Sequence, residues 1–171
     1  MDYTTSELAI LSSMNWLHLL ATVAWIGGMI FVIAAVTPAA KETLEPPVMG
    51  RFMGSLMKKF RVMIYVSIGL LVATGIVMMF MNEESGGTFD FGNTWTLFLV
   101  LKHIFVLILI ILGIYMMEVI VPKIGRLGAK GPSPEMAKAQ KLQMRIGAIN
   151  FILAILILIC TAVNGAISVL V

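Results

Sequence analysis

Residues 8 to 40 read LAILSSMNWLHLLATVAWIGGMIFVIAAVTPAA, a stretch without one formally charged side chain. A helix needs about 20 mostly apolar residues to cross the hydrocarbon core of a membrane, so this stretch predicts a transmembrane helix that is tilted or overlong. Thr4 and Glu7 precede it at the spacing of a capping box, which predicts where the helix begins. We expect Pro38 to mark its end.

Three further apolar stretches follow, at about residues 62–81, 94–121 and 146–171, and Pro122 is a stop signal after the second of these. Only 12% of the 171 residues are charged, whereas a soluble domain has about 25%, so much of the surface must face lipid. We therefore predict an all-α, integral membrane four-helix bundle in which residues 1–171 form a single four-span domain.

The connection between the first two spans contains Pro46-Pro47 as a helix breaker. Met49, Met53 and Met57 then recur at helical spacing beside Lys58 and Lys59. An amphipathic segment of this kind is typical of a helix that lies in the membrane interface. We expect a short cytoplasmic interfacial helix from Val48 to Lys59.

The basic residues predict the orientation. Five of the twelve lie between the first and second spans and six between the third and fourth. They are Lys41, Arg51, Lys58, Lys59 and Arg61, and then Lys123, Arg126, Lys130, Lys138, Lys141 and Arg145. Cytoplasmic loops are enriched in Lys and Arg, so we expect a multi-pass protein of the cytoplasmic membrane with both termini non-cytoplasmic (N-out/C-out). Basic residues confined to the ends of spans do not indicate a nucleic-acid partner.

The twelfth basic residue, Lys102, lies inside the third span beside His103, and the only other histidine, His18, lies inside the first. Ionisable groups are costly in a bilayer core unless they are satisfied, which makes them candidates for function. The first and third spans run parallel, and His18 follows Glu7 by eleven residues while His103 follows Asp90 by thirteen. At about 1.5 Å per residue, both imidazoles should lie roughly 15–20 Å inward from those acids.

Two imidazoles at one depth are suited to be the axial ligands of a haem b iron. Our leading hypothesis is a membrane b-type cytochrome that binds one haem between the first and third spans through His18 and His103 and transfers electrons. Lys102 would stabilise a propionate, and Asn164 could contact one. Trp25 follows His18 by two helical turns and would pack on the haem or its ligand. The simpler alternative for the histidines is a hydrogen bond between helices.

Trp25 is followed by two glycines, and Gly28 would permit close approach of a porphyrin or of a neighbouring helix. Packing is the simpler interpretation of Gly28 and of Asn164. No residue is assigned a catalytic role, although the hypothesis makes the chain a candidate membrane oxidoreductase. Its partners would be the lipid bilayer and a quinone or a redox partner protein. A homodimer is suggested, since four helices scarcely surround a porphyrin.

The sequence also resembles a known family. The residues that carry the resemblance are His18, Trp25-Ile26-Gly27-Gly28, Pro38, Thr74-Gly75, Trp95 and Lys102. They are similar to motifs of the CopD-type membrane superfamily and of the related HemJ-type protoporphyrinogen oxidases. The resemblance implies a four-helix core, haem b bound through His18 and a functional role for Lys102. The fourth span lacks the Asn-Glu-x-Pro-Thr run of HemJ-type enzymes, which leaves a porphyrinogen oxidase as a lesser alternative.

CopD-type proteins are associated with copper handling, and the chain contains fourteen methionines. Thioether sulfur is a soft ligand that suits Cu(I). Met78, Met79 and Met81 lie near the outer end of the second span, and Met116 and Met117 near the inner end of the third. Methionine is also an ordinary filler of gaps in hydrophobic packing. Copper as the ligand, in a Cu(I) transporter or copper-delivery protein, is therefore an alternative to haem.

Overall fold

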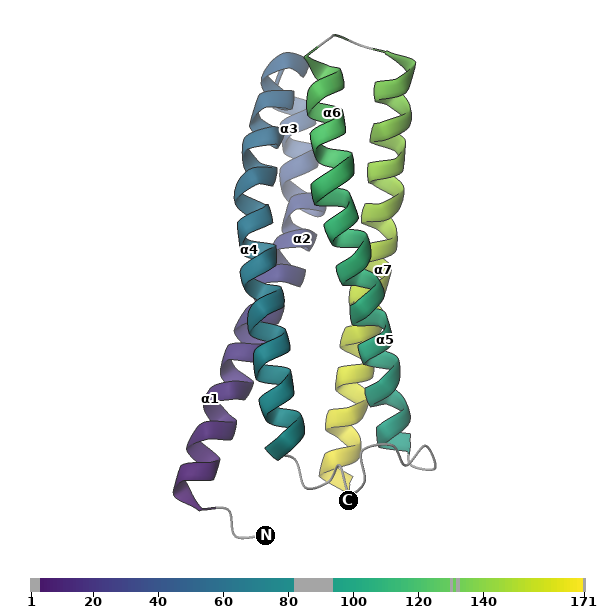
Figure 1. Ribbon diagram of the computed structural model, residues 1–171. Helices are drawn as coiled ribbons and strands as arrows, with labels where there is room; N and C mark the ends of the chain where they lie inside the picture. The colour runs from purple at the N-terminus through teal and green to yellow at the C-terminus, as the bar shows by residue number, and fades with distance from the viewer. Residues whose placement is uncertain (1–3, 82–93, 130, 132, 171) are drawn as a thin grey trace.

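The computed structural model describes residues 4–81, 94–129, 131 and 133–170, and its four long helical rods lie side by side (Figure 1). The first rod comprises α1 (Thr5–Thr22), η1 (Val23–Gly27), α2 (Gly28–Phe31), η2 (Val32–Val36) and α3 (Thr37–Thr43). The second is α4 (Pro46–Met81), and the third comprises α5 (Thr94–Tyr115), η4 (Met116–Ile120) and α6 (Val121–Gly128). The fourth is α7 (Pro134–Leu170). Each rod is long and apolar enough to cross a membrane, which confirms the predicted four-helix membrane bundle.

The capping box predicted at the start of the first rod is present. The Thr4 hydroxyl accepts a hydrogen bond from the Glu7 backbone N–H at 3.3 Å, and the Glu7 carboxylate accepts one from the Thr4 backbone N–H at 2.9 Å. Each side chain therefore satisfies a backbone donor that the first helical turn leaves without a partner.

Two predicted helix ends are wrong, because neither Pro38 nor Pro122 stops its rod. Each proline instead lies in the first turn of a new α-helical segment, immediately after a π-helical turn, η2 or η4. A proline removes one backbone donor, and in a membrane other groups must then serve the carbonyls of that turn. In the first rod the Thr37 hydroxyl donates at 2.7 Å to the Val32 carbonyl, which also accepts the Thr37 backbone N–H, so this bond reinforces the π-helical turn before Pro38.

The separate interfacial helix predicted from Val48 to Lys59 is also wrong in one respect. The segment is helical as expected, but it is the first part of the continuous helix α4, which runs from Pro46 to Met81. The breaker Pro46-Pro47 stands at the start of α4, where prolines are tolerated, and no proline follows within the helix. The rod therefore extends well beyond the apolar stretch at residues 62–81.

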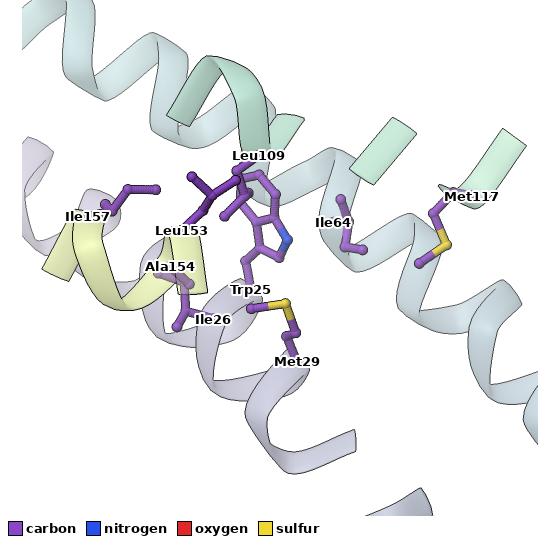
Figure 2. Packing of buried hydrophobic residues seen from close by; sticks show 9 residues of the cluster. All are labelled: Trp25, Ile26, Met29, Ile64, Leu109, Met117, Leu153, Ala154 and Ile157. Atoms are coloured by element: carbon purple, nitrogen blue, oxygen red, sulfur yellow. The ribbon is translucent and has the colours of Figure 1, made fainter. Parts of the chain in front are cut away.

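The rods pack as two pairs, α1 with α4 and α5 with α7. A cluster of buried apolar side chains joins the pairs at mid-height, and Figure 2 shows its members. These are Trp25, Ile26 and Met29 from the first rod, Ile64 from the second, Leu109 and Met117 from the third, and Leu153, Ala154 and Ile157 from the fourth. This core fixes the relative height of the rods, and with it the depth of the polar residues within them.

Both basic connections, between α3 and α4 and between α6 and α7, lie at one end of the bundle (Figure 1). Helix α1 begins and helix α7 ends at the opposite end. The arrangement is the one that the charge pattern requires, with the two basic connections on a common side. That this side is the cytoplasm remains a prediction from the positive-inside rule.

Candidate functional site

His18 lies on the face of α1 that packs against α4, and its ring is held by Thr74. Atom Nδ1 of His18 is 2.8 Å from Oγ1 of Thr74, and the same hydroxyl donates to the Leu70 carbonyl at 2.6 Å. A hydroxyl has one proton to donate, so with that proton on the carbonyl it must accept from the imidazole. His18 is therefore the Nδ1–H tautomer, and its Nε2 carries a free lone pair.

Gly75, the residue after Thr74, leaves room for the imidazole of His18. A Cβ atom added at Gly75 would lie 3.7 Å from Cε1 of His18, so the imidazole rests against the backbone of α4 at this point. Thr74 itself is only 3% exposed. Thr74-Gly75 thus forms a platform in which the hydroxyl orients the imidazole and the glycine lets it approach.

His103, on α5, adopts the same tautomer by a different route. Its Nδ1 is 2.6 Å from the carbonyl oxygen of Leu99, one turn earlier in the same helix. A carbonyl only accepts, so Nδ1 carries the proton and Nε2 the lone pair. The His103 side chain is exposed on the isolated chain, whereas His18 is partly buried. Both histidines therefore offer Nε2 to a metal.

Lys102 and His103, on α5, lie within electrostatic range of His18, on α1. The charge of Lys102 and the imidazole of His103 both act electrostatically on His18. Lys102 is partly buried, and Cys160 on α7 lies within its electrostatic range.

Asn164 lies one helical turn from Cys160 on α7, and its side chain is buried with 8% exposure. Neither its amide oxygen nor its amide nitrogen has a hydrogen-bond partner among the described residues. Leaving a buried polar group unsatisfied costs about 1–3 kcal/mol, so this amide is suited to a ligand or to bound water. Of the predicted site residues, Asn164 is the one whose buried polar atoms lack hydrogen-bond partners among the described residues.

Trp25 and Gly28, the remaining predicted site residues, lie in packed surroundings. Trp25 is 5% exposed and belongs to the apolar cluster, among whose members Figure 2 shows its indole. A Cβ at Gly28 would lie 2.7 Å from Cε of Met63 and 2.9 Å from Cε2 of Phe60. Gly28 therefore lets the side chains of α4 reach the backbone of the first rod.

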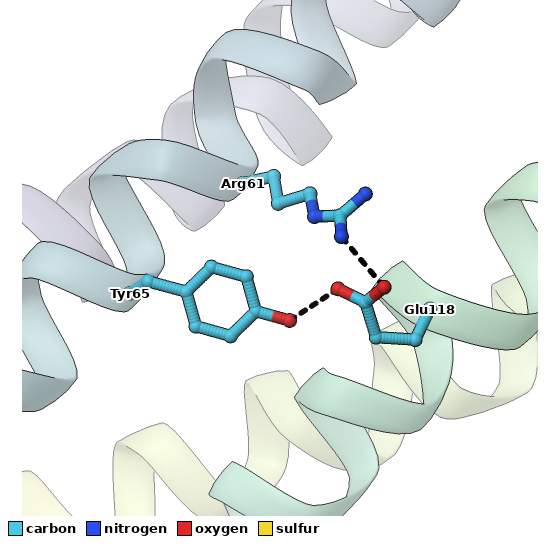
Figure 3. A network of polar contacts seen from close by, with 3 residues as sticks. All are labelled: Arg61, Tyr65 and Glu118. Atoms are coloured by element: carbon cyan, nitrogen blue, oxygen red, sulfur yellow. Dashed lines mark hydrogen bonds and ion pairs between the residues drawn. The ribbon is translucent and has the colours of Figure 1, made fainter.

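A polar network that the sequence interpretation missed links α4 to η4 (Figure 3). Glu118 accepts a hydrogen bond from the Tyr65 hydroxyl and pairs with the Arg61 guanidinium at 2.6 Å. The guanidinium also lies 5.9 Å from the centroid of the Tyr65 ring. Glu118 is the one acidic residue in the apolar stretch 94–121, and this isolated charge is the feature of the sequence that could have indicated the network. Its ion pair is 44% and 38% exposed, so it contributes at most about 1 kcal/mol.

Among the described residues, no group of three or more His, Cys, Asp or Glu side chains could hold a metal ion. A metal bound here would therefore take fewer ligands of these types and complete its shell from another source. Methionine sulfur or a cofactor would provide that source.

These observations define a polytopic α-helical membrane protein with two histidines of the same tautomer within its spans. A family model described as copper resistance protein D (CopD) matches residues 54–164, more than half of the chain, so the chain belongs to the CopD family. Its family makes it a membrane protein related to copper resistance, and the CopD resemblance is confirmed. The match includes Thr74, Lys102 and Asn164 but begins after His18. Comparison with curated proteins and with solved structures returns no match.

Proposed function

We propose that this chain handles copper in the membrane and that His18 binds Cu(I) through Nε2. The observation that carries the proposal is the hydrogen bond between His18 Nδ1 and Thr74 Oγ1, which leaves Nε2 as the free donor atom. Histidine ligands of metals almost always donate their other ring N–H to a second group, which fixes both tautomer and orientation. Membership of the copper resistance protein D family supports copper as the metal.

The setting of His18 also suits Cu(I) in particular. An imidazole in an apolar bundle adds no charge of its own, so a monovalent ion is less costly to desolvate there than a divalent one. Imidazole nitrogen and thioether sulfur are ligands that copper accepts, whereas Mg²⁺ and Ca²⁺ prefer oxygen. The site would serve transport of Cu(I) across the membrane or its delivery to a partner.

The test is a competition for Cu(I) between the purified, detergent-solubilised full chain and a chromogenic chelator, without oxygen. We expect the wild type to hold Cu(I) and His18→Ala to lose the tight site. Leu19→Ala is the matched control, because Leu19 is the next residue on α1 and is 52% exposed. Equal Cu(I) affinity in the wild type and His18→Ala would contradict the proposal.

Binding of haem b is a second candidate, and the orphaned amide of Asn164 favours it. Lys102 on α5 lies within electrostatic range of Cys160 on α7, and the unpartnered amide of Asn164 is one helical turn from Cys160. Such a pair suits a carboxylate such as a haem propionate, while His18 and His103 each offer Nε2 to the iron. The haem would then carry electrons to or from a quinone or a redox partner.

An absorption spectrum of the same preparation separates the candidates. Sharp reduced α and β bands that vanish in His18→Ala and in His103→Ala would favour the cytochrome. A high-spin spectrum that survives His103→Ala would favour a haem enzyme with an open iron position. A colourless, folded protein that binds Cu(I) supports copper handling, which is the result we expect.

A further inference from the structure

The seam between α1 and α4 has a regular register that extends outward from His18. On α1 the partly or fully buried positions include Leu11, Met14, His18 and Ala21, while residues 12, 13, 15, 16, 19 and 20 are exposed. On α4 they include Leu71, Thr74, Met78 and Met81, while residues 72, 73, 76, 79 and 80 are exposed. Steps of three and four residues on both helices describe one continuous face of each.

The hydrogen bond between His18 and Thr74 fixes how the two faces align. Helix α4 runs antiparallel to α1, towards the end of the bundle where α1 begins (Figure 1). One turn outward from His18 is Met14, and one turn outward from Thr74 is Met78. The antiparallel register therefore sets Met14 opposite Met78 in the layer directly outside the imidazole.

We infer that Met14 and Met78 bind Cu(I) together with His18, as the outer thioether ligands of that site. The inference rests on the proposed function and names the ligands that would complete it. Two thioethers and one imidazole form an uncharged, soft donor set that favours Cu(I) over divalent ions with oxygen or nitrogen preference. Such a site is compatible with the absence, among the described residues, of a metal-binding group of three His, Cys, Asp or Glu side chains, because two of its three ligands are methionines.

Met79 and Met117 provide a contrast. Met79 follows Met78 directly but is 41% exposed on another face of α4, and Met117 is 2% exposed in the apolar cluster. Methionine in such places fills space or faces lipid. Met14 and Met78 differ because both are partly buried and the register sets them one turn outward from His18 and Thr74.

The experiment uses Met→Leu substitutions, since these conserve volume and usually cost less than about 1.5 kcal/mol of stability. We expect Met14→Leu and Met78→Leu each to lower the Cu(I) affinity at least about tenfold. Mutating a group that only hydrogen-bonds to a metal ligand already costs about tenfold or more in metal affinity, and the loss of a ligand should cost no less. The double variant should lose more. Met79→Leu is the matched control and should bind Cu(I) like the wild type.

X-ray absorption of the Cu(I)-loaded wild type supplies a readout that needs no variant. We expect copper–sulfur scattering in the wild type and its loss in the Met14→Leu/Met78→Leu protein, with copper–nitrogen scattering retained. Wild-type copper without sulfur ligands, or a double variant with unchanged affinity, would overturn the inference. If His18→Ala alone weakens binding, the proposed function stands without the thioethers. If the wild type binds no Cu(I), both fall.

Discussion

The role of Thr74 can be tested by replacing it with valine, which keeps the shape of the side chain and removes its hydroxyl. The change removes the hydroxyl that accepts the hydrogen bond from His18 Nδ1 at 2.8 Å. The Leu70 carbonyl also loses the hydrogen bond that this hydroxyl donates to it. Hydrogen bonds between membrane helices contribute about 0.6 kcal/mol on average and at most about 1.7, so the free energy of unfolding should fall only modestly. The packing of α1 on α4 should survive.

The effect on copper should be larger than the effect on stability. Removing the group that orients a metal-binding histidine costs roughly 10–100-fold in metal affinity, because the ring can then rotate and change tautomer. We expect Thr74→Val to bind Cu(I) that much more weakly, and Thr74→Ser, which keeps the hydroxyl, to remain close to the wild type. The affinities come from chelator competition, and the stability from thermal unfolding in detergent.

A third measurement addresses the tautomer directly. Nitrogen NMR of labelled histidine distinguishes a protonated Nδ1 from a protonated Nε2, and the wild type should show Nδ1–H for His18. Unchanged Cu(I) affinity in Thr74→Val, or equal losses in the valine and serine variants, would refute the argument that this hydroxyl positions the ligand. A protonated Nε2 in the metal-free wild type would refute it as well.

Three other predictions follow from the geometry. Gly28→Ala should lower the free energy of unfolding by about 1–3 kcal/mol, as overpacking does, whereas Gly165→Ala, where the added Cβ meets nothing within 4 Å, should cost little; thermal unfolding that ranks them in reverse would contradict the packing. Asn164→Leu should stabilise the metal-free protein in thermal unfolding by about 1 kcal/mol, because it removes two unsatisfied polar atoms; a loss of stability would show that the amide has a partner. Single cysteines at Thr5 and Gly128, in a chain without Cys160, should react with a membrane-impermeant reagent from opposite sides, with Gly128 cytoplasmic; labelling from one side would refute the topology.

Much of the fold could be predicted from local features of the sequence. Apolar stretches long enough to cross the membrane leave few options but spanning helices, because backbone polar groups in lipid must be satisfied within the segment. The capping box at Thr4 and Glu7 is equally local, and the structure contains it as predicted. The ends of the rods were harder, since Pro38 and Pro122 usually stop a helix and here follow π-helical turns that accommodate them.

The candidate site was only partly visible in the sequence. Lys102 and the two histidines could be identified as candidates because ionisable side chains are costly in a bilayer core. That cost depends only on the apolar stretch around each residue, so it can be inferred from the sequence. The partners of His18 could not be found in the same way, since Thr74 and Gly75 are 56 and 57 positions away along the chain. Only the antiparallel alignment of α1 with α4 brings them to the imidazole.

The sequence by itself therefore determined the number of spans, their helical nature and the identity of the intramembrane ionisable residues, because each depends on the solvation of a segment by its immediate surroundings. The tertiary structure decided which helices pair, which residues of α4 meet His18 and which of its nitrogens carries the proton. Those properties depend on contacts between helices, and one residue of shift in register would turn each of these side chains to a different face.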